Sequence, residues 1–148
     1  MPLPPLTRDG DLPLGVHRAS LRELLDRFGV GSRQRVAVAG RLERIYRVAQ
    51  DTGHLARFVV FGSFLTDKPE PNDVDVFLVM EDTFDGAKLQ GEAAVLFDHG
   101  AADAHFGASV FWVRRLAALG GEQITIEYWQ AKRGGGKRGI VEIVEEAL

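Results

Sequence analysis

Residues 73–80 (DVDVFLVM) constrain the fold of this chain more than any other segment. Beyond its two aspartates the segment is entirely apolar, so the strand that it predicts needs cover on both faces. A strand of this kind lies in the middle of a sheet that has further layers above and below it. Residues 57–61 (RFVVF) form a second apolar run of β-forming residues and predict the neighbouring strand.

The flanking segments predict helices and further strands around this pair. Residues 20–28 begin with a capping box, and residues 32–52 carry apolar residues at three- and four-residue spacing, so both segments predict helices. A helical region, a strand and a helical turn are expected further on, over residues 86–105, 108–113 and 114–119. This order predicts an α/β or α+β domain with a mixed sheet of about four or five strands.

The C-terminal part is expected to form a β-hairpin. Ile124, Ile126 and Tyr128 alternate with polar residues as in a strand, and residues 140–144 form another β-like run. The glycine-rich segment 132–137 (KRGGGK) lies between the two runs and suits a turn.

Composition limits the class of protein. The 148 residues, 45% of them hydrophobic, suit one compact domain over residues 1–148, and the absence of cysteine excludes disulfides and thiolate metal sites. Residues 1–14 hold four of the six prolines and are expected to form an extended arm rather than a signal peptide. No apolar run approaches the ~20 residues of a membrane span, so we expect a soluble cytoplasmic protein. The net charge of −3 argues against sequence-independent binding of long duplex DNA.

Two carboxylates stand at the start of the central strand. Asp73 and Asp75 are two residues apart, so on a strand they project from the same face, ~6.6 Å apart along the backbone. Two neighbouring anions beside a buried strand are costly unless a cation compensates them. A hard divalent cation with oxygen ligands, Mg²⁺ or Mn²⁺, is the natural partner.

A glycine and a serine follow the preceding strand. Gly62 lets the backbone approach a ligand closely, and Ser63 can begin a helical turn whose N–H groups and hydroxyl point at a phosphate. In-line phosphoryl transfer needs both a phosphate cradle and a cation site.

These features together resemble the minimal nucleotidyltransferases of the DNA-polymerase-β-like superfamily. In that group a strand, Gly-Ser, a spacer and Asp-x-Asp on the next strand follow one another; here they are Gly62-Ser63, nine residues and Asp73-Val74-Asp75. The chain looks like the compact bacterial branch, which includes nucleotidyltransferases of toxin–antitoxin pairs. The resemblance covers residues 57–80 and implies a nucleotidyltransferase-type mixed sheet flanked by helices.

The resemblance is incomplete at the third carboxylate. The superfamily carries it on the next strand, but residues 108–113 (ASVFWV) contain no acid, and Ser109 stands roughly where one is expected. A substitute acid near the aspartate pair favours an enzyme, whereas a serine-lined position favours a protein that binds without transfer. The candidate substitutes are Asp98, Asp103, Glu122 and Glu127.

The densest basic segment is residues 132–139 (KRGGGKRG). Its cations, Lys137 and Arg138 in particular, are expected to help bind the phosphates of a nucleotide. The alternative for this segment is a solvated loop tip. The aromatic residues Phe111, Trp112, Tyr128 and Trp129 read most simply as core or edge residues, with base stacking by one of them as the alternative.

The resemblance implies metal-dependent transfer of a nucleoside monophosphate from an NTP to a hydroxyl of a protein, an RNA end or a small molecule, with release of pyrophosphate. Asp73 and Asp75 would be the catalytic metal ligands, and a partner protein could complete the acceptor site. The second interpretation is a non-catalytic, regulatory or antitoxin-like member that binds a nucleotide or a partner. The third is purely structural: turn chemistry for Asp73, and an ion pair between Asp75 and Arg57.

Overall fold

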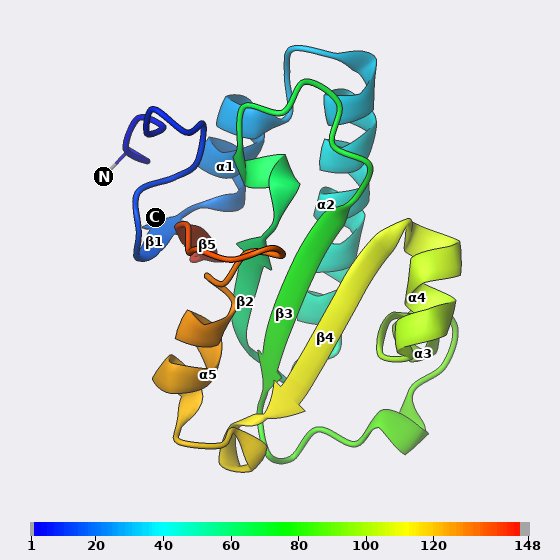
Figure 1. The fold of residues 1–148 in the computed structure, drawn as a ribbon. Helices are drawn as coiled ribbons and strands as arrows, with labels where there is room; N and C mark the ends of the chain where they lie inside the picture. Colours follow the sequence, from blue (N-terminus) through cyan, green and yellow to red (C-terminus); the bar gives the residue numbers. More distant parts are fainter. Residues whose placement is uncertain (1, 146–148) are drawn as a thin grey trace.

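The structure, a computed structural model, describes residues 2–145 and contains a five-stranded mixed sheet of order β1-β5-β2-β3-β4 (Figure 1). β2 pairs antiparallel with β3 and β5, while β3–β4 and β1–β5 are parallel pairs. The mixed α+β class is therefore confirmed. The strands are β1 (Val16–Ala19), β2 (Leu55–Phe61), β3 (Val74–Met80), β4 (Ala108–Arg114) and β5 (Ile140–Ile143).

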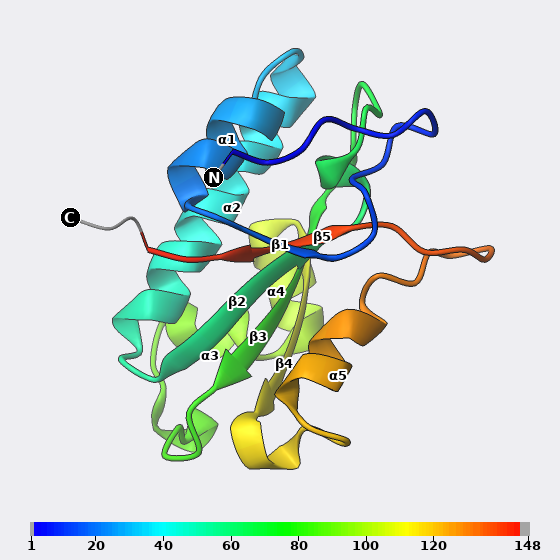
Figure 2. The same cartoon turned by 90° about the vertical axis from the view of Figure 1, so that its left-hand side faces the viewer.

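Helices cover the two faces of this sheet unequally. Four helices lie on one face and α5 alone lies on the other (Figure 2). The helices are α1 (Leu21–Phe28), α2 (Arg33–Asp51), α3 (Glu92–Leu96), α4 (His99–Phe106) and α5 (Glu122–Tyr128). Three short 3₁₀ turns connect elements: η1 (Ser63–Leu65), η2 (Gly86–Lys88) and η3 (Arg115–Ala117).

The central strand is buried from both sides, as its composition predicts. Val74, Val76 and Leu78 are fully buried in the core beneath α1–α4. Phe77 and Val79 point to the opposite face, into a smaller core that α5 closes. Because side chains alternate along a strand, Asp75 belongs to this second face, the α5 face.

The helix starts follow the expected capping chemistry. The Ser20 hydroxyl accepts a hydrogen bond from the Glu23 N–H (3.1 Å), and the Ser32 hydroxyl accepts one from the Arg35 N–H (3.1 Å). Only half of the predicted capping box forms, because the Glu23 carboxylate accepts from the Leu3 N–H instead. The first helix is thus joined to the N-terminal arm.

The arm, described from Pro2 onward because Met1 lies outside the described residues, packs along α1 and the end of the sheet (Figure 2). Leu3 and Leu12 are buried in the main core. Arg27 donates to two arm carbonyls, and the Gly139 N–H donates to the Leu12 carbonyl (3.0 Å). These contacts hold the arm beside the segment that enters β5.

The prediction of a C-terminal hairpin is wrong, because residues 122–128 form helix α5 rather than a strand. Of the alternating apolar residues only Ile126 is buried, while Ile124 and Tyr128 are 62% and 68% exposed. Ile126 and Trp129 are three apart, so both face the sheet from one side of a helix. β5 instead lies between β2 and β1 in the sheet. β1 is a short strand that the sequence did not predict.

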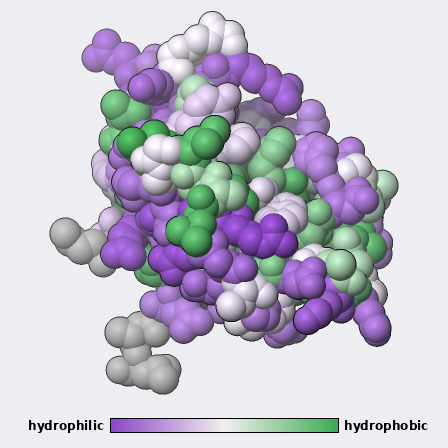
Figure 3. Space-filling model, turned by 90° about the horizontal axis from the view of Figure 1, so that it is seen from below, coloured by the Kyte–Doolittle hydropathy of each residue, from purple (hydrophilic) through white to green (hydrophobic). Residues whose placement is uncertain are grey.

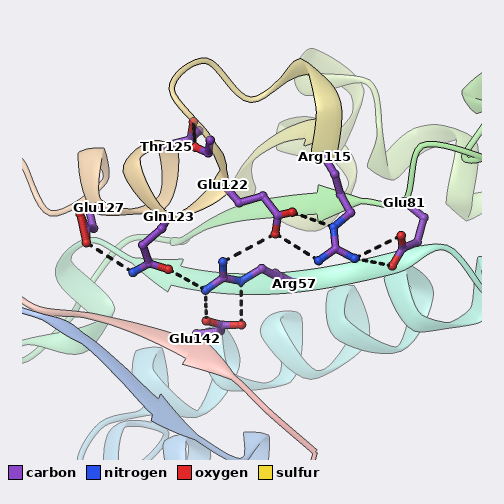
Figure 4. A network of polar contacts seen from close by, with 9 residues as sticks. Arg57, Glu81, Arg115, Glu122, Gln123, Thr125, Glu127 and Glu142 are labelled. Carbon is purple, nitrogen blue, oxygen red and sulfur yellow. Dashed lines mark hydrogen bonds and ion pairs between the residues drawn. The ribbon is translucent and has the colours of Figure 1, made fainter.

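A chain of ion pairs ties α5 to the sheet at the end where β3 finishes (Figure 4). Arg57 on β2 donates to both carboxylate oxygens of Glu142 on β5 (3.0 and 2.6 Å) and lies 3.6 Å from the Glu122 carboxylate of α5. Arg115 donates to Glu122 (2.7 Å) and to Glu81 (3.0 Å). We call these five residues the arginine network.

The end of the molecule beside η3 and α5 carries exposed apolar side chains. Leu116 and Leu119 are 88% and 89% exposed, and Figure 3 shows hydrophobic side chains among hydrophilic ones on this end.

Among the described residues, no helix combines the length and the apolar character needed to cross a membrane.

Candidate functional site

The two aspartates lie where β3 enters the sheet. Asp73 immediately precedes the strand, and Asp75 is its second residue. Across the sheet Asp75 is in register with Phe61 at the end of β2 and with Ser109 near the start of β4. One edge of the sheet thus brings together the end of one strand and the beginnings of two others.

Gly62 lies directly against the Asp75 carboxylate. Its φ of +92° favours glycine, and a Cβ at this position would overlap the Oδ2 atom of Asp75. The Gly62-Ser63 and Asp73-Val74-Asp75 segments are separated by nine residues in the sequence, and the fold brings them into contact. Ser63 follows as the first residue of η1.

The loop between these two segments is fixed by α2. The guanidinium of Arg35, only 6% exposed, donates to four backbone carbonyls. They belong to Phe28 (3.0 Å), Phe64 (2.8 Å), Thr66 (2.6 Å) and Lys68 (2.6 Å). Further along the loop, Gln34 donates to the carbonyls of Pro71 (3.0 Å) and Asn72 (3.2 Å). The sequence places Arg35 on a helix face of arginines and glutamines that reads as solvated, so its burial was missed.

Burial makes the aspartate pair electrostatically unfavourable. The pKa of Asp75 is raised to about 6, first by burial and then by the neighbouring charge of Asp73. The pKa of Asp73 is raised by burial and by the charge of Asp103. A hydrogen bond from Ser109 and nearby cations oppose these shifts without cancelling them.

The cations that face the pair come from two directions. Arg133 lowers the pKa of both aspartates by its charge, and Arg138 lowers that of Asp75. Arg41, from α2, acts on Asp73 and donates to the Asn72 carbonyl (3.3 Å). The basic loop therefore lies close enough to the carboxylates to lower their pKa values, although Arg133 was not among the residues predicted to bind phosphate.

The basic loop is held by a buried carboxylate of the arm. Asp11, 8% exposed, pairs with Lys132 (2.6 Å) and Arg138 (3.4 Å). Lys137 is exposed and forms an antiparallel bridge with Ala131. Of the two predicted phosphate ligands, Arg138 thus lies close enough to Asp75 to influence its pKa, and Lys137 lies on the turn.

The third position is a serine, as the sequence suggested. Ser109 faces Asp75 in the β3–β4 register and hydrogen-bonds to its carboxylate. Of the four candidate substitute acids, only the exposed Asp103 acts on the pair, through the pKa of Asp73. The other three have partners elsewhere: Asp98 caps α4, Glu122 pairs with arginines, and Glu127 accepts from Gln123.

A divalent cation fits this donor set as a partial site. Within residues 2–145 no group of three or more His, Cys, Asp or Glu side chains could hold a metal ion. Mg²⁺ is commonly held by one or two carboxylates together with waters and the phosphates of a substrate. Asp73 and Asp75 match that pattern, and burial raises the pKa of both carboxyls. We call Gly62, Ser63, Asp73, Asp75 and Ser109 the carboxylate site.

The alternative ion pair between Arg57 and Asp75 does not form. Arg57 pairs with Glu142 and Glu122 at the other end of the strands. The purely structural interpretation therefore loses the partner that would have neutralised Asp75.

Residues 4–144 match the model of a family of unknown function (DUF6932), and the chain belongs to this family. Comparisons with curated proteins and with solved structures found no match.

Proposed function

We propose that this chain, whose family has no established function, transfers a nucleoside monophosphate from an NTP to a hydroxyl acceptor with Mg²⁺ or Mn²⁺ held by Asp73 and Asp75. The observation that carries the proposal is the contact between the Gly62 backbone and the Asp75 carboxylate. It joins the Gly62-Ser63 turn, to which we assign phosphate binding, to the aspartate pair at the start of β3. This is the arrangement that the resemblance to polymerase-β-like nucleotidyltransferases implies.

The energetic argument supports a cationic ligand. Burial raises the pKa values of both aspartates, and the charges of Asp103 and Asp73 raise those of Asp73 and Asp75 further, so the ionised pair is destabilised in the protein alone. A divalent ion would remove this penalty, and it would offset negative charge on the phosphate oxygens of a bound nucleotide. The cost of two neighbouring anions is easier to explain as a binding device than as a structural one.

The protein residues would position and neutralise the triphosphate. The Gly62 backbone and the Ser63 hydroxyl would hold phosphate oxygens, and Arg133 and Arg138 would offset the charge of the leaving group. The acceptor oxygen attacks the α-phosphorus and forms a new P–O bond. The bond from the α-phosphorus to the bridging oxygen breaks, pyrophosphate leaves with the electron pair, and the hydroxyl proton passes to water.

The test is a thermal-shift and pyrophosphate assay with each NTP and with Mg²⁺ or Mn²⁺. A ligand at 100 times its Kd stabilises the folded state by about 2.7 kcal/mol, which raises Tm by several degrees. The shift and the release of pyrophosphate should both be lost in Asp73→Asn/Asp75→Asn and kept in Asp51→Asn, which removes an exposed carboxylate from the end of α2. A wild-type protein that shows no shift with any NTP would contradict the proposal.

A second candidate function is nucleotide binding without transfer, and Ser109 favours it. Because Ser109 is in register with Asp75, the position of the third carboxylate carries only a hydroxyl. This candidate predicts a metal-dependent thermal shift without pyrophosphate release in the wild-type protein. Ser109→Asp would then be expected to introduce pyrophosphate release, whereas an active wild-type enzyme should gain little from the same change.

A further inference from the structure

Three phenyl rings form a row on the α5 face of the sheet. Phe61, Phe77 and Phe111 lie on the adjacent strands β2, β3 and β4. The indole of Trp129, just after α5, lies over all three, with ring-centroid distances of 4.6, 5.2 and 4.8 Å. These distances are typical of stacked aromatic pairs.

Phe111 is the most exposed ring of this row, since Phe61 is half-buried and Phe77 is buried. It is 36% exposed, whereas Phe77 is 3% exposed. β4 is the last strand of the sheet, and α5 covers the face mainly over β2 and β3. The imidazole of His99 flanks Phe111 at 4.8 Å, with the rings inclined by 38°. The exposed part of Phe111 is therefore bordered by Trp129 and by His99.

The position of Phe111 relates it to the carboxylate site. Ser109 is in register with Asp75, and Phe111 follows two residues later on the same face of β4. Phe61, at the other side of Asp75, belongs to the same aromatic cluster. A molecule whose phosphates lie against Gly62 and the aspartates would meet an aromatic surface as it extends along β4.

The cluster also leaves one hydrogen-bond donor without a partner. The indole Nε1 of Trp129 is buried and has no acceptor among residues 2–145. Buried polar atoms in this condition are rare in folded proteins.

We propose that Phe111, flanked by Trp129 and His99, stacks on the base of the nucleotide whose phosphates occupy the carboxylate site. This inference rests on the proposed function and assigns the nucleoside part of its substrate. Stacking on an aromatic ring uses the π-face that every base has, so the contact accepts all four bases and favours a nucleotide over a bare polyphosphate.

The experiment compares ATP with inorganic tripolyphosphate, both in Mg²⁺, by isothermal titration calorimetry. The wild-type protein should bind ATP more tightly than tripolyphosphate. Phe111→Leu, which keeps an apolar side chain beneath Trp129, should weaken ATP binding about tenfold and leave tripolyphosphate binding unchanged. Phe111→Trp should retain ATP binding, and Tyr128→Leu, which removes an exposed ring from α5, should change neither ligand.

Three results would overturn the inference, and they separate it from the proposed function. Equal ATP affinity in the wild-type protein and Phe111→Leu would exclude stacking while leaving the nucleotide site intact. An equal loss of both ligands would show that Phe111 maintains the phosphate site rather than the base site. A wild-type protein that binds neither ligand would remove the proposed function together with this inference.

Discussion

The α5 face of the sheet carries two polar clusters at opposite ends of the strands, the arginine network and the carboxylate site. The two clusters differ in how far their charges are compensated. In the arginine network each carboxylate faces a guanidinium, and the pKa of Glu122 is lowered by its hydrogen bond from Arg115. In the carboxylate site two aspartates lie two residues apart without such a partner, and burial raises the pKa of both. Removing one partner of a buried ion pair is strongly destabilising, whereas an unneutralised pair is a candidate binding site.

The largest effect should come from breaking the arginine network. Arg57→Met leaves the carboxylate of Glu142, whose side chain is 7% exposed, without its bidentate partner. We expect the free energy of unfolding to fall by about 3 kcal/mol, measured by urea denaturation at pH 7. The double change Arg57→Met/Glu142→Leu should restore most of this loss, because it removes the orphaned charge as well. A loss below about 1 kcal/mol in Arg57→Met would mean that the network contributes little to the fold.

The next effect concerns the contact that assembles the carboxylate site. Gly62→Ala puts a side chain at φ +92° and against the Asp75 carboxylate, so it should cost about 2 kcal/mol in urea denaturation. Gly53→Ala is the matched control, because Gly53 has φ +74° with no neighbouring atom within 4 Å of an added Cβ. It should cost about 1 kcal/mol from backbone strain alone.

A double-mutant cycle isolates the contact with Asp75 from backbone strain, because Gly62 has φ +92° and ψ −168°, a region that is almost exclusive to glycine. In an Asp75→Ala background Gly62→Ala should cost less than in the wild-type protein. An equal cost in both backgrounds would place the collision elsewhere and contradict the close approach of the two segments.

The third prediction is a variant that raises the free energy of unfolding, whereas the first two variants lower it. It compares the carboxylate site directly with the arginine network. The pKa of Asp75 is about 6 in the folded protein against 3.8 ordinarily, so the folded state binds this proton more readily than the unfolded state does. The contribution of Asp75 to the free energy of unfolding therefore falls as the pH rises from about 4 to 6. Asp75→Asn should stabilise the metal-free protein by about 1–2 kcal/mol at pH 8, less than the full linkage because the site is partly solvated.

The stability of Asp75→Asn over a range of pH, together with a matched variant, tests whether removing the Asp75 charge stabilises the protein. In EDTA, the gain from Asp75→Asn should shrink toward zero near pH 4. Glu122→Gln should instead destabilise the protein at pH 8, because the pKa of Glu122 is lowered by Arg115 and its charged form is the stabilising one. If both variants lost stability at pH 8, the two clusters would not differ in the way described.

Local sequence patterns predicted most of the fold correctly. The capping serines at 20 and 32 marked the starts of α1 and α2, and the apolar run 76–80 identified the central strand. Alternation failed at residues 124–128, because two of the three apolar residues there are exposed and only Ile126 reaches the core. β1 was missed because its four residues include a histidine and an arginine, and its pairing with β5 depends on tertiary structure.

For the site, too, local sequence spacing predicted some of the residues, whereas others come together only in the folded structure. Residue spacing was enough to propose that Gly62, Asp73 and Asp75 act together, and Ser109, which the sequence singled out on the next strand, is in register with Asp75. Spacing could not reveal that Arg133 rather than Lys137 faces the carboxylates, since the turn of the loop decides this. It also could not show that Arg35 fixes the intervening loop, because its four carbonyl partners come together only after folding.

The smallest effect concerns the Ser109 hydroxyl, which opposes the rise in the pKa of Asp75. The hydrogen bond from Ser109 lowers the pKa of Asp75, so Ser109→Ala should raise it above its wild-type value. The change in the free energy of unfolding should be about 0.5 kcal/mol, and carboxyl ¹³C NMR titration of the metal-free protein measures the pKa itself. Thr125→Val, which removes a hydroxyl from α5, is the control and should leave the titration of Asp75 unchanged. A pKa of Asp75 that does not rise in Ser109→Ala would show that the serine does not face the carboxylate, and the case for Ser109 as the substituted third position would fail with it.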